Sequence, residues 1–199
     1  MAEVYMNKYD SPLGEIVLAC DGAGLTGLWF SGQKYFPPEI EKTHIFSEHE
    51  HIKAAVRWLD VYFSGKEPEF TPALHIETTP FRMAVIEKLL EISYGETLSY
   101  GELAERLGKG KGAAQAVGSA VGHNPVSIIV PCHRVIASDG SLTGYAGGLD
   151  RKLALLNLES LPSPLGKVPE GRMRSFVCKP QHSAKLKGAL RGKDLIRHG

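Results

Sequence analysis

The chain has 199 residues, of which 43% are hydrophobic and 23% are charged, and its formal net charge is +1. This composition is ordinary for a soluble globular protein with one domain or two small ones. No apolar run approaches the roughly 20 residues of a membrane helix, and the first residues lack a secretion signal, which predicts a cytoplasmic protein without a membrane partner.

Three cysteines, Cys20, Cys132 and Cys178, are widely separated and odd in number. This pattern argues against a disulfide framework in that compartment. The sequence also lacks the CxxC and HxxxH spacings that a compact zinc site would use. We therefore predict that the protein holds neither a metal nor a cofactor.

Residues 1–75 predict an α/β domain made of a small antiparallel sheet and one helix. Apolar and polar side chains alternate in the first 30 residues, with the turn signals DSPLGE and DGAG between the runs. The helix is expected over residues 47–65, where Ser47 and Glu50 match a capping box. Three prolines within residues 66–80 then indicate a linker and a domain boundary.

Residues 76–159 predict an all-α domain of the winged or helix-turn-helix type. Thr79 and Pro80 match the N-cap and first position of a helix, and apolar residues follow them at helical spacing. A second capping box, at Ser99 and Glu102, opens a short helix. Many small helical domains share such an arrangement, so the helix-turn-helix motif is weak on this pattern alone.

A third helix is expected within residues 109–125 and must stop before Pro125. Its sequence, KGKGAAQAVGSAVGHNP, has almost no bulky side chains. It is either a helix packed tightly against its neighbours or a helix whose backbone approaches a large ligand closely. Periodicity alone does not separate these interpretations. A glycine-rich loop and a last helix over 149–159 follow, and the last helix is expected to bury Leu149, Leu153 and Leu156.

The stretch SIIVPCHRVI (127–136) places Cys132 after a proline and directly before His133. A free thiol is only a few per cent ionised at neutral pH, so a nucleophilic cysteine needs a nearby base or a positive environment. Neighbouring side chains of an extended chain point in opposite directions, which favours a water between Cys132 and His133 over direct contact. A buried, inert cysteine is the alternative, since cysteine is among the most buried residue types.

These motifs together resemble the O6-alkylguanine-DNA alkyltransferases, the methylated-DNA–protein-cysteine methyltransferases. The resemblance covers residues 79–159 through YGETLSYGELAERLG, AVGSAVGHNP, IIVPCHRVI and LTGYAGGLDRKLALL, and extends more faintly to DSPLG at 10–14. It implies a DNA repair protein that transfers an alkyl group from guanine O6 irreversibly to its own Cys132, once per molecule. Alkylated thymine O4 stays open as a second substrate.

The resemblance also implies roles for matching residues. Glu159 would orient His133, which would activate Cys132 through a water, while Asn124 would brace the turn before the cysteine. Tyr100 would contact the flipped base and help the leaving guanine accept a proton. A monomer would bind the minor groove of double-stranded DNA and rotate the damaged base outward. The implied DNA contacts are Tyr100, Ala114, Gln115, Gly118, Ser119 and Arg134, and the implied pocket residues are Val135, Tyr145, Ala146 and Gly147.

Three positions are compared with the residues that other family members have there. Gln115 stands where the family often has an arginine that takes the place of the extruded nucleotide, and glutamine lacks the guanidinium's charge and stacking plane. Ala146 stands where some members have a serine near the guanine. From Gln115 we expect a weaker hold on the opened duplex without loss of the chemistry, while Ala146 bears on one hydrogen bond near the guanine. Cys20 lies near a zinc ligand of some members, but no further ligands are recognisable, so no metal is predicted.

Residues 160–199 form a basic extension past the family's usual end. They carry nine Lys and Arg against two Asp and Glu, a net charge of +7, whereas residues 1–159 carry 14 against 20, a net charge of −6. Four prolines and five glycines predict a flexible segment. It is either a solvated extension, the interpretation we favour, or an arm that neutralises DNA phosphates. Only in the second case should deleting 161–199 weaken DNA binding at low salt.

Three other classes of protein compete with this interpretation. A non-catalytic sensor of alkylated DNA with the same fold would have another residue, usually tryptophan, in place of Cys132. A helix-turn-helix transcription regulator would need base-reading side chains on the third helix, where only Gln115 and His123 are available. A thiol enzyme acting on small molecules would have a concave pocket and no groove-binding helix.

Overall fold

The computed structural model describes residues 3–37, 39–40 and 45–159, and the predictions for residues 160–199 lie outside the described residues. Three strands, β1 (Tyr5–Ser11), β2 (Gly14–Cys20) and β3 (Leu25–Phe30), form an antiparallel meander whose turns coincide with the two predicted turn signals.

A short fourth strand, β4 (Ile45–Phe46), runs parallel to β1, so the strand order is β3-β2-β1-β4. The predicted antiparallel sheet is therefore wrong at this edge, and the sheet is mixed. The long connection between β3 and β4 explains the difference, because a parallel neighbour needs a crossover that a tight hairpin cannot provide.

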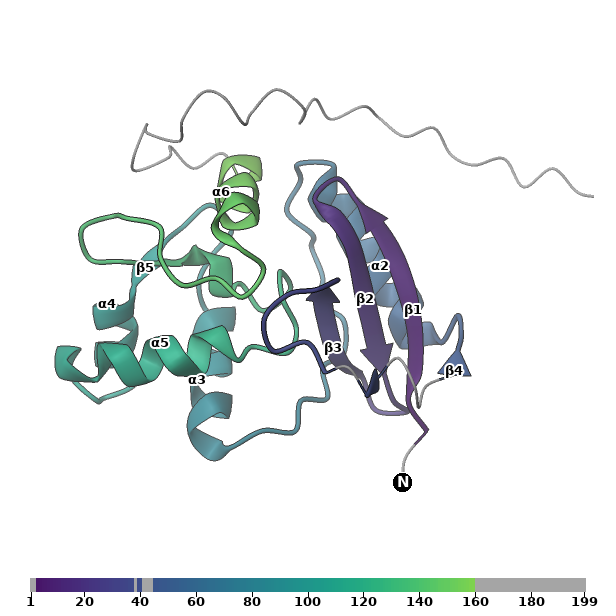
Figure 1. Ribbon diagram of the computed structural model, residues 1–199, viewed down its shortest axis with the longest axis horizontal. Helices are drawn as coiled ribbons and strands as arrows, with labels where there is room; N and C mark the ends of the chain where they lie inside the picture. The colour runs from purple at the N-terminus through teal and green to yellow at the C-terminus, as the bar shows by residue number, and fades with distance from the viewer. Residues whose placement is uncertain (1–2, 38, 41–44, 160–199) are drawn as a thin grey trace, which may run out of the picture. The chain divides into compact units, whose positions relative to one another are not determined.

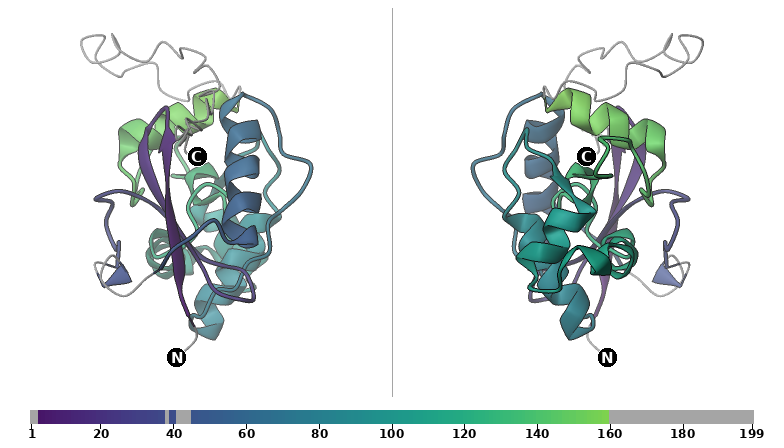
Figure 2. Two further views of the ribbon diagram at one scale, coloured as in Figure 1. Left: turned by 90° about the vertical axis from the view of Figure 1, so that its right-hand side faces the viewer. Right: turned by 90° about the vertical axis from the view of Figure 1, so that its left-hand side faces the viewer.

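Helix α2 (Glu50–Phe63) packs on one face of this sheet, as the edge-on views of Figure 2 show. The predicted capping box at Ser47 is wrong, because the N-cap is His49, whose ring accepts a hydrogen bond from the backbone N–H of His51 at 3.4 Å. The Ser47 N–H is instead donated to the carbonyl of Met6 at 3.1 Å, which keeps Ser47 in the extended edge of the sheet.

The second half of the described chain is mostly helical, and three of its helices pack together (Figure 1). The Ser99 capping box forms as predicted, with the Glu102 N–H donated to Oγ of Ser99 at 3.1 Å and the Ser99 N–H donated to Glu102 at 2.7 Å. The elements are α3 (Pro80–Leu90), β5 (Leu98–Ser99), α4 (Tyr100–Arg106), the 3-10 turn η1 (Lys111–Ala113), α5 (Ala114–Gly122), the 3-10 turn η2 (Cys132–Arg134), β6 (Val135–Ile136) and α6 (Leu149–Leu158).

Two details differ from the predicted all-α domain. Strands β5 and β6 form a two-stranded parallel sheet, in which Leu98 pairs with Val135. Leu149 is 48% exposed rather than buried, because it is the first residue of α6, while Leu153 and Leu156 are buried as predicted. None of the helices in the described part of the chain is long and apolar enough to cross a membrane.

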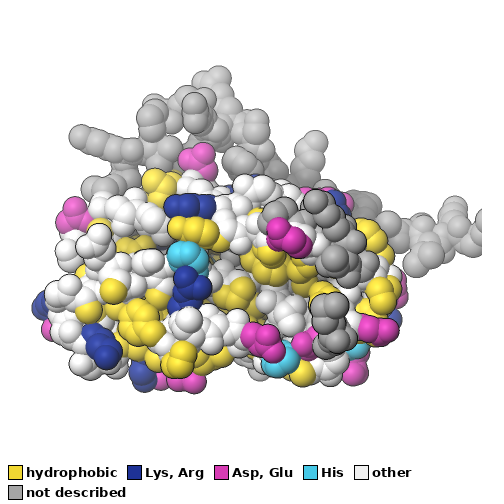
Figure 3. All heavy atoms as spheres, turned by 60° about the horizontal axis from the view of Figure 1, so that its bottom comes forward, with side chains coloured by type: hydrophobic (Ala, Val, Ile, Leu, Met, Phe, Trp, Pro, Cys, Tyr) yellow, Lys and Arg dark blue, Asp and Glu magenta, His cyan; other side chains and the backbone are white. Residues whose placement is uncertain are grey.

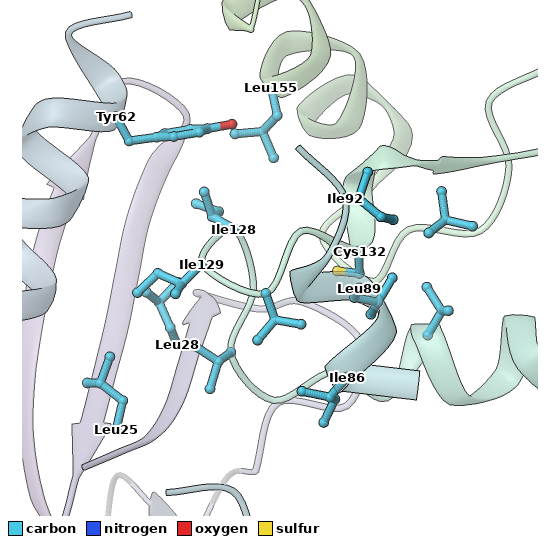
Figure 4. Close-up of a cluster of buried hydrophobic side chains, with 14 of the residues drawn as sticks. Leu25, Leu28, Tyr62, Ile86, Leu89, Ile92, Ile128, Ile129, Cys132 and Leu155 are labelled. Atoms are coloured by element: carbon cyan, nitrogen blue, oxygen red, sulfur yellow. The ribbon is translucent and has the colours of Figure 1, made fainter. Parts of the chain in front are cut away.

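The predicted boundary near residue 75 does not separate two cores. Strand β3 pairs with the segment before Cys132, since the Leu28 N–H is donated to the carbonyl of Pro125 and the Ser127 N–H to that of Leu28, both at 2.8 Å. Figure 4 shows Leu25 and Leu28 of the sheet in the same hydrophobic cluster as Ile128, Ile129 and Cys132. The two predicted domains therefore share this hydrophobic cluster, and the boundary between them stays a prediction.

Candidate active site

Cys132 lies at the start of η2, at the end of a buried turn with unusual backbone geometry. Its side chain is only 5% exposed and borders the hydrophobic cluster of Figure 4. Ile128, four residues earlier, has a φ of 71°, a left-handed conformation that is rare for a β-branched residue. Such strain persists only where the surroundings enforce it, and it is often found at functional sites.

Asn124 enforces this turn and contacts the sulfur. Its side-chain amide donates hydrogen bonds to the carbonyl of Val130 at 2.9 Å and to that of Val126 at 3.3 Å, and its Oδ1 accepts the Val126 N–H at 3.0 Å. The same Nδ2 lies 3.1 Å from Sγ of Cys132. One buried side chain thus ties both ends of the turn together and donates toward the thiol.

Behind Cys132, a fully buried network centres on the carboxylate of Glu159. His133 Nε2 lies 2.8 Å from Oε1, and the hydroxyl of Tyr62 donates to the same oxygen at 2.8 Å. Arg134 donates to both carboxylate oxygens, from Nε at 2.9 Å and from Nη2 at 3.0 Å. The backbone N–H of Gly95 adds a bond to Oε2 at 3.2 Å. Five donor atoms from four residues therefore fix this carboxylate.

Arg134, which was predicted to contact DNA, is buried in the structure and directed toward Glu159. It is 7% exposed, and besides Glu159 it donates from Nη1 to the carbonyl of Ile92 at 2.6 Å. Its guanidinium also lies over the ring of Tyr94, 5.6 Å from the centroid. These three hydrogen bonds are directed inward, and they give the buried carboxylate of Glu159 a positive partner.

The charges of this network set the protonation of His133 and Glu159. Burial alone would raise the pKa of Glu159, but the hydrogen bonds and charges of His133 and Arg134 outweigh it and lower that pKa to about 2. Burial lowers the pKa of His133, with Glu159 opposing. His133 is therefore a neutral ring at physiological pH, with Nε2 directed to the carboxylate. Its other nitrogen, Nδ1, is buried and has no hydrogen-bond partner among the described residues.

Burial also raises the pKa of Cys132, so the resting group is a thiol. The hydrogen bond from Asn124 and the positive charge of Lys152 act in the opposite direction. Lys152 is itself fully buried, and its Nζ donates to the carbonyls of Val135 at 2.5 Å and Thr143 at 2.7 Å. Burial lowers the pKa of Lys152 to about 8. A nucleophilic thiolate here requires proton removal close to the time of reaction.

The glycine-rich loop 143–148 and Tyr100 cover this region. The Tyr100 hydroxyl donates to the carbonyls of Thr143 and Gly144, each at 3.2 Å. Burial and the nearby Cys132 raise the pKa of Tyr100, so it remains protonated. Of the predicted pocket residues, Val135 is fully buried in β6, while Tyr145, Ala146 and Gly147 lie on the loop, with the Tyr145 ring 6.5 Å from that of His133.

Two of the predicted DNA contacts lie on the outer side of helix α5. Gln115 and Ser119 are exposed, whereas Val117, Ala120 and Val121 face the core. Gly118 lies against Tyr100, since a Cβ there would sit 3.5 Å from the Tyr100 ring. A helix with so little bulk on its outer side leaves its backbone accessible to a large partner.

The end of this surface is formed by an aromatic stack. His123, the C-cap of α5, stacks on Tyr35 with ring centroids 4.0 Å apart, and Lys34 Nζ lies 4.7 Å from the Tyr35 centroid. Tyr35 is 49% exposed and has a φ of 65°.

In Figure 3 most Asp and Glu side chains lie on the right-hand side of the face shown. Residues 76–159 carry 8 Lys and Arg against 9 Asp and Glu, while residues 1–75 carry 6 against 11. The helical half is thus the less acidic one.

Three residues of the site were not predicted from the sequence. Tyr62 comes from α2 in the first half of the chain, and a tyrosine on an apolar helix face, whose hydroxyl needs a partner, was the available signal. Lys152 is a lysine on the buried side of α6, adjacent to positions predicted as core. Arg151 contacts both the β1–β2 turn and loop 143–148, and no local pattern marks it.

Cys20 lies apart from this site. It is buried in β2, and burial raises the pKa of its thiol to about 11. Its neighbour Asp21 pairs with His75 at 2.6 Å. Within the described ranges, no three His, Cys, Asp or Glu side chains are grouped closely enough to hold a metal ion.

Comparison with known families gives two matches that together span most of the chain. Residues 4–76 match the ribonuclease-like domain of 6-O-methylguanine DNA methyltransferase, and residues 80–161 match the DNA-binding domain of the same family.

Curated proteins show the same similarity. A methylated-DNA–protein-cysteine methyltransferase of Mycobacterium bovis is 47% identical over 161 residues, which cover 81% of this chain and 95% of that protein. The protein of that name from Haemophilus influenzae is 40% identical over 164 residues, covering 81% of this chain and 89% of the other.

Solved structures agree with these matches. The crystal structure of Mycobacterium tuberculosis OGT in complex with DNA aligns with a TM-score of 0.72 at 46% identity, covering 80% of this chain and 96% of that one. An O6-methylguanine DNA methyltransferase from Methanococcus jannaschii aligns with a TM-score of 0.57 at 29% identity, covering 79% and 93%.

Proposed function

The chain belongs to the 6-O-methylguanine DNA methyltransferase family, and we propose that it repairs DNA by moving the alkyl group of O6-alkylguanine onto Sγ of its own Cys132. The observation that carries this assignment is the position of Cys132 beside the buried pair of His133 and Glu159, with the Asn124 amide 3.1 Å from the sulfur. A structural cysteine would need none of these groups.

The reaction begins with removal of the thiol proton. His133 is neutral and its Nε2 side is held by Glu159, so Nδ1 is the nitrogen that accepts a proton. A buried ring nitrogen is normally hydrogen-bonded, and a water between Nδ1 and Cys132 would relay the proton without direct contact. Glu159 then stabilises the imidazolium, as the carboxylate does in other triads.

In the transfer step, the thiolate attacks the alkyl carbon in line with its bond to guanine O6. The S–C bond forms, the C–O6 bond breaks, and its electron pair stays on the guanine. The protonated Tyr100 hydroxyl donates to the leaving base and regains its proton from His133, so the thiol proton ends on guanine. The product is a thioether, and none of the described residues at the site could cleave it, so each molecule reacts once. An alkyl group on thymine O4 would undergo the same substitution.

The target base must leave the duplex to reach a buried sulfur, at a cost of a few kcal/mol. We propose that α4 and α5 form a helix-turn-helix whose second helix enters the minor groove, with Gln115, Ala114, Gly118 and Ser119 toward the DNA. The near absence of bulk on the outer side of α5 supports this geometry. A single active site with all its groups on one chain supports action as a monomer.

Stoichiometry tests this function. The protein is mixed with increasing amounts of a duplex that carries one O6-methylguanine, and repaired guanine is counted. We expect a burst that stops at one equivalent per chain, together with a gain in protein mass of one methylene. Repeated turnover, or repair without a gain in protein mass, would contradict the proposal.

Replacing Gln115 by arginine should strengthen the hold on the opened duplex. Gln115 is exposed at the first turn of α5, where a guanidinium can stack in the space left by the flipped base. We expect about five- to tenfold tighter binding of the damaged duplex, which is the lower end of the roughly 1–3 kcal/mol that a stacked base contact contributes. Transfer from a free O6-benzylguanine base, which needs no flipping, should stay unchanged. Equal affinity for the two proteins would refute the intercalation role of this position.

A further inference from the structure

Loop 143–148 has little conformational preference of its own. Three of its six residues are glycines, and Gly144 and Gly148 have positive φ angles of 55° and 94°. Its path is therefore set by the groups that hold its carbonyls. At the start of the loop, the side chains of Tyr100 and Lys152 donate hydrogen bonds to the carbonyls of Thr143 and Gly144. These contacts all lie within the helical half of the chain.

The second half of the loop is linked to the first half of the chain, directly by Lys34 and through Arg151. The Lys34 N–H is donated to the carbonyl of Ala146 at 3.1 Å. Arg151 donates from Nη1 to the carbonyl of Gly147 and from Nε to the carbonyl of Leu13, each at 3.0 Å. Leu13 lies in the β1–β2 turn, so one side chain links that turn to the loop.

The contacts around Arg151 extend to Tyr145. The guanidinium lies 4.5 Å from the centroid of Phe30, and a Cβ on Gly147 would lie 3.1 Å from the Phe30 ring and 2.7 Å from the Tyr145 ring. Gly147 is thus pressed between two aromatic rings, of which Tyr145 faces His133. Moving the carbonyl of Gly147 would shift Tyr145 at the wall of the candidate pocket.

We propose that Arg151 is a positioning residue that sets the size of the alkyl pocket by fixing the Tyr145–Gly147 wall against the β1–β2 turn. The inference rests on the proposed function and adds a determinant of its substrate range. It also gives the DSPLG turn a function: Gly14, with a φ of 110°, leaves room for Arg151, since a Cβ there would lie 3.2 Å from Nη2.

The test compares two alkyl groups in one DNA sequence. Single-turnover rates and half-saturation constants are measured for duplexes carrying O6-methylguanine or O6-benzylguanine. With Arg151→Ala, we expect methyl transfer at saturation to slow about tenfold, because misplacement of a pocket wall by a fraction of an ångström weakens alignment of the small group. The bulky benzyl group fills the loosened pocket, so its rate should fall less, and the benzyl-to-methyl ratio should rise about fivefold.

Two further variants separate positioning from stability. Arg151→Lys keeps the charge, but an ammonium group lacks the planar fork that donates to the carbonyls of both Leu13 and Gly147. We therefore expect a benzyl-to-methyl ratio between those of the parent and Arg151→Ala. Arg57→Ala, at an exposed position of α2, should leave the ratio and both rates at parent values. A purely structural Arg151 would slow both substrates equally in both Arg151 variants, and an unchanged ratio would overturn the inference. Absence of transfer by the parent protein would instead refute the proposed function.

Discussion

Replacing Glu159 by glutamine should slow alkyl transfer roughly a thousandfold, as expected when the group that fixes a catalytic imidazole loses its charge. Glutamine has the same size but can no longer hold His133 by a charged hydrogen bond at 2.8 Å or stabilise its protonated form. Single-turnover transfer from a methylated duplex measures the effect. A rate within threefold of the parent would show that Glu159 is structural only.

The same variant should be less stable by about 3–5 kcal/mol, because Arg134 is left buried without its counter-charge. The effect depends on pH in a defined direction. The folded-state pKa of Glu159 is about 2, below its ordinary value of about 4.5, so its stabilisation is complete above about pH 4.5 and is lost as the pH falls toward 2. Denaturant unfolding between pH 2 and 7 should show about 3 kcal/mol of this loss in the parent, by the linkage relation, and not in the variant.

A matched control is Glu15→Gln. Glu15 is paired with Lys8 at 3.0 Å and accepts a hydrogen bond from the Ser31 hydroxyl at 2.7 Å, and an exposed ion pair contributes no more than about 1 kcal/mol. Its loss should change neither the transfer rate nor the acid profile beyond that amount. A Glu15 variant as damaging as Glu159→Gln would attribute both effects to general loss of negative charge.

Replacing Asn124 by alanine should affect the nucleophile directly. The variant loses the amide that bridges the strained turn and the donor to Sγ at 3.1 Å. Since that hydrogen bond lowers the pKa of Cys132, its loss should raise the thiol pKa further. We expect transfer about 100-fold slower at neutral pH, partly recovered at higher pH, and about 2–4 kcal/mol less stability from the unsatisfied backbone groups.

Asn7→Ala provides the comparison for a side-chain amide far from the sulfur. Asn7 also bonds the backbone, donating to the carbonyl of Ser47 at 3.2 Å and accepting the Lys8 N–H at 2.8 Å. Its loss should lower stability by about 1 kcal/mol and leave the pH profile of transfer unchanged. If the Asn124 variant also kept the parent profile, Asn124 would act on the fold and not on the thiol.

Features set by neighbouring residues were predictable from the sequence, and features set by distant partners were not. The capping box at Ser99 forms because its partners are three residues apart. The same pattern at Ser47 fails because β1, about 40 residues earlier, takes its N–H. The resemblance assigned Arg134 to DNA, and nothing in the local sequence indicated its ion pair with a carboxylate 25 residues later.

In the site, too, the residues close in the chain were predictable and the contacts between distant residues were not. The motif around Cys132 located the nucleophile candidate, its histidine and the turn, since these are close in the chain. Tyr62 contacts Glu159 across 97 residues and Arg151 contacts Leu13 across 138. Such contacts depend on how the sheet packs against the helical half, and no local pattern encodes them. The roles of Gln115, Gly118 and Ser119 at DNA stay predictions.

The most direct test of the central claim is to follow the methyl group to its atom. A duplex with one O6-methylguanine carrying a deuterated methyl is incubated with the full chain, and the protein is digested and mapped by mass spectrometry. The label should appear on Cys132 alone, with one methyl per chain. Label on Cys20 or Cys178, or its release into solution while Cys132 stays unmodified, would contradict the assignment of Cys132 as the nucleophile.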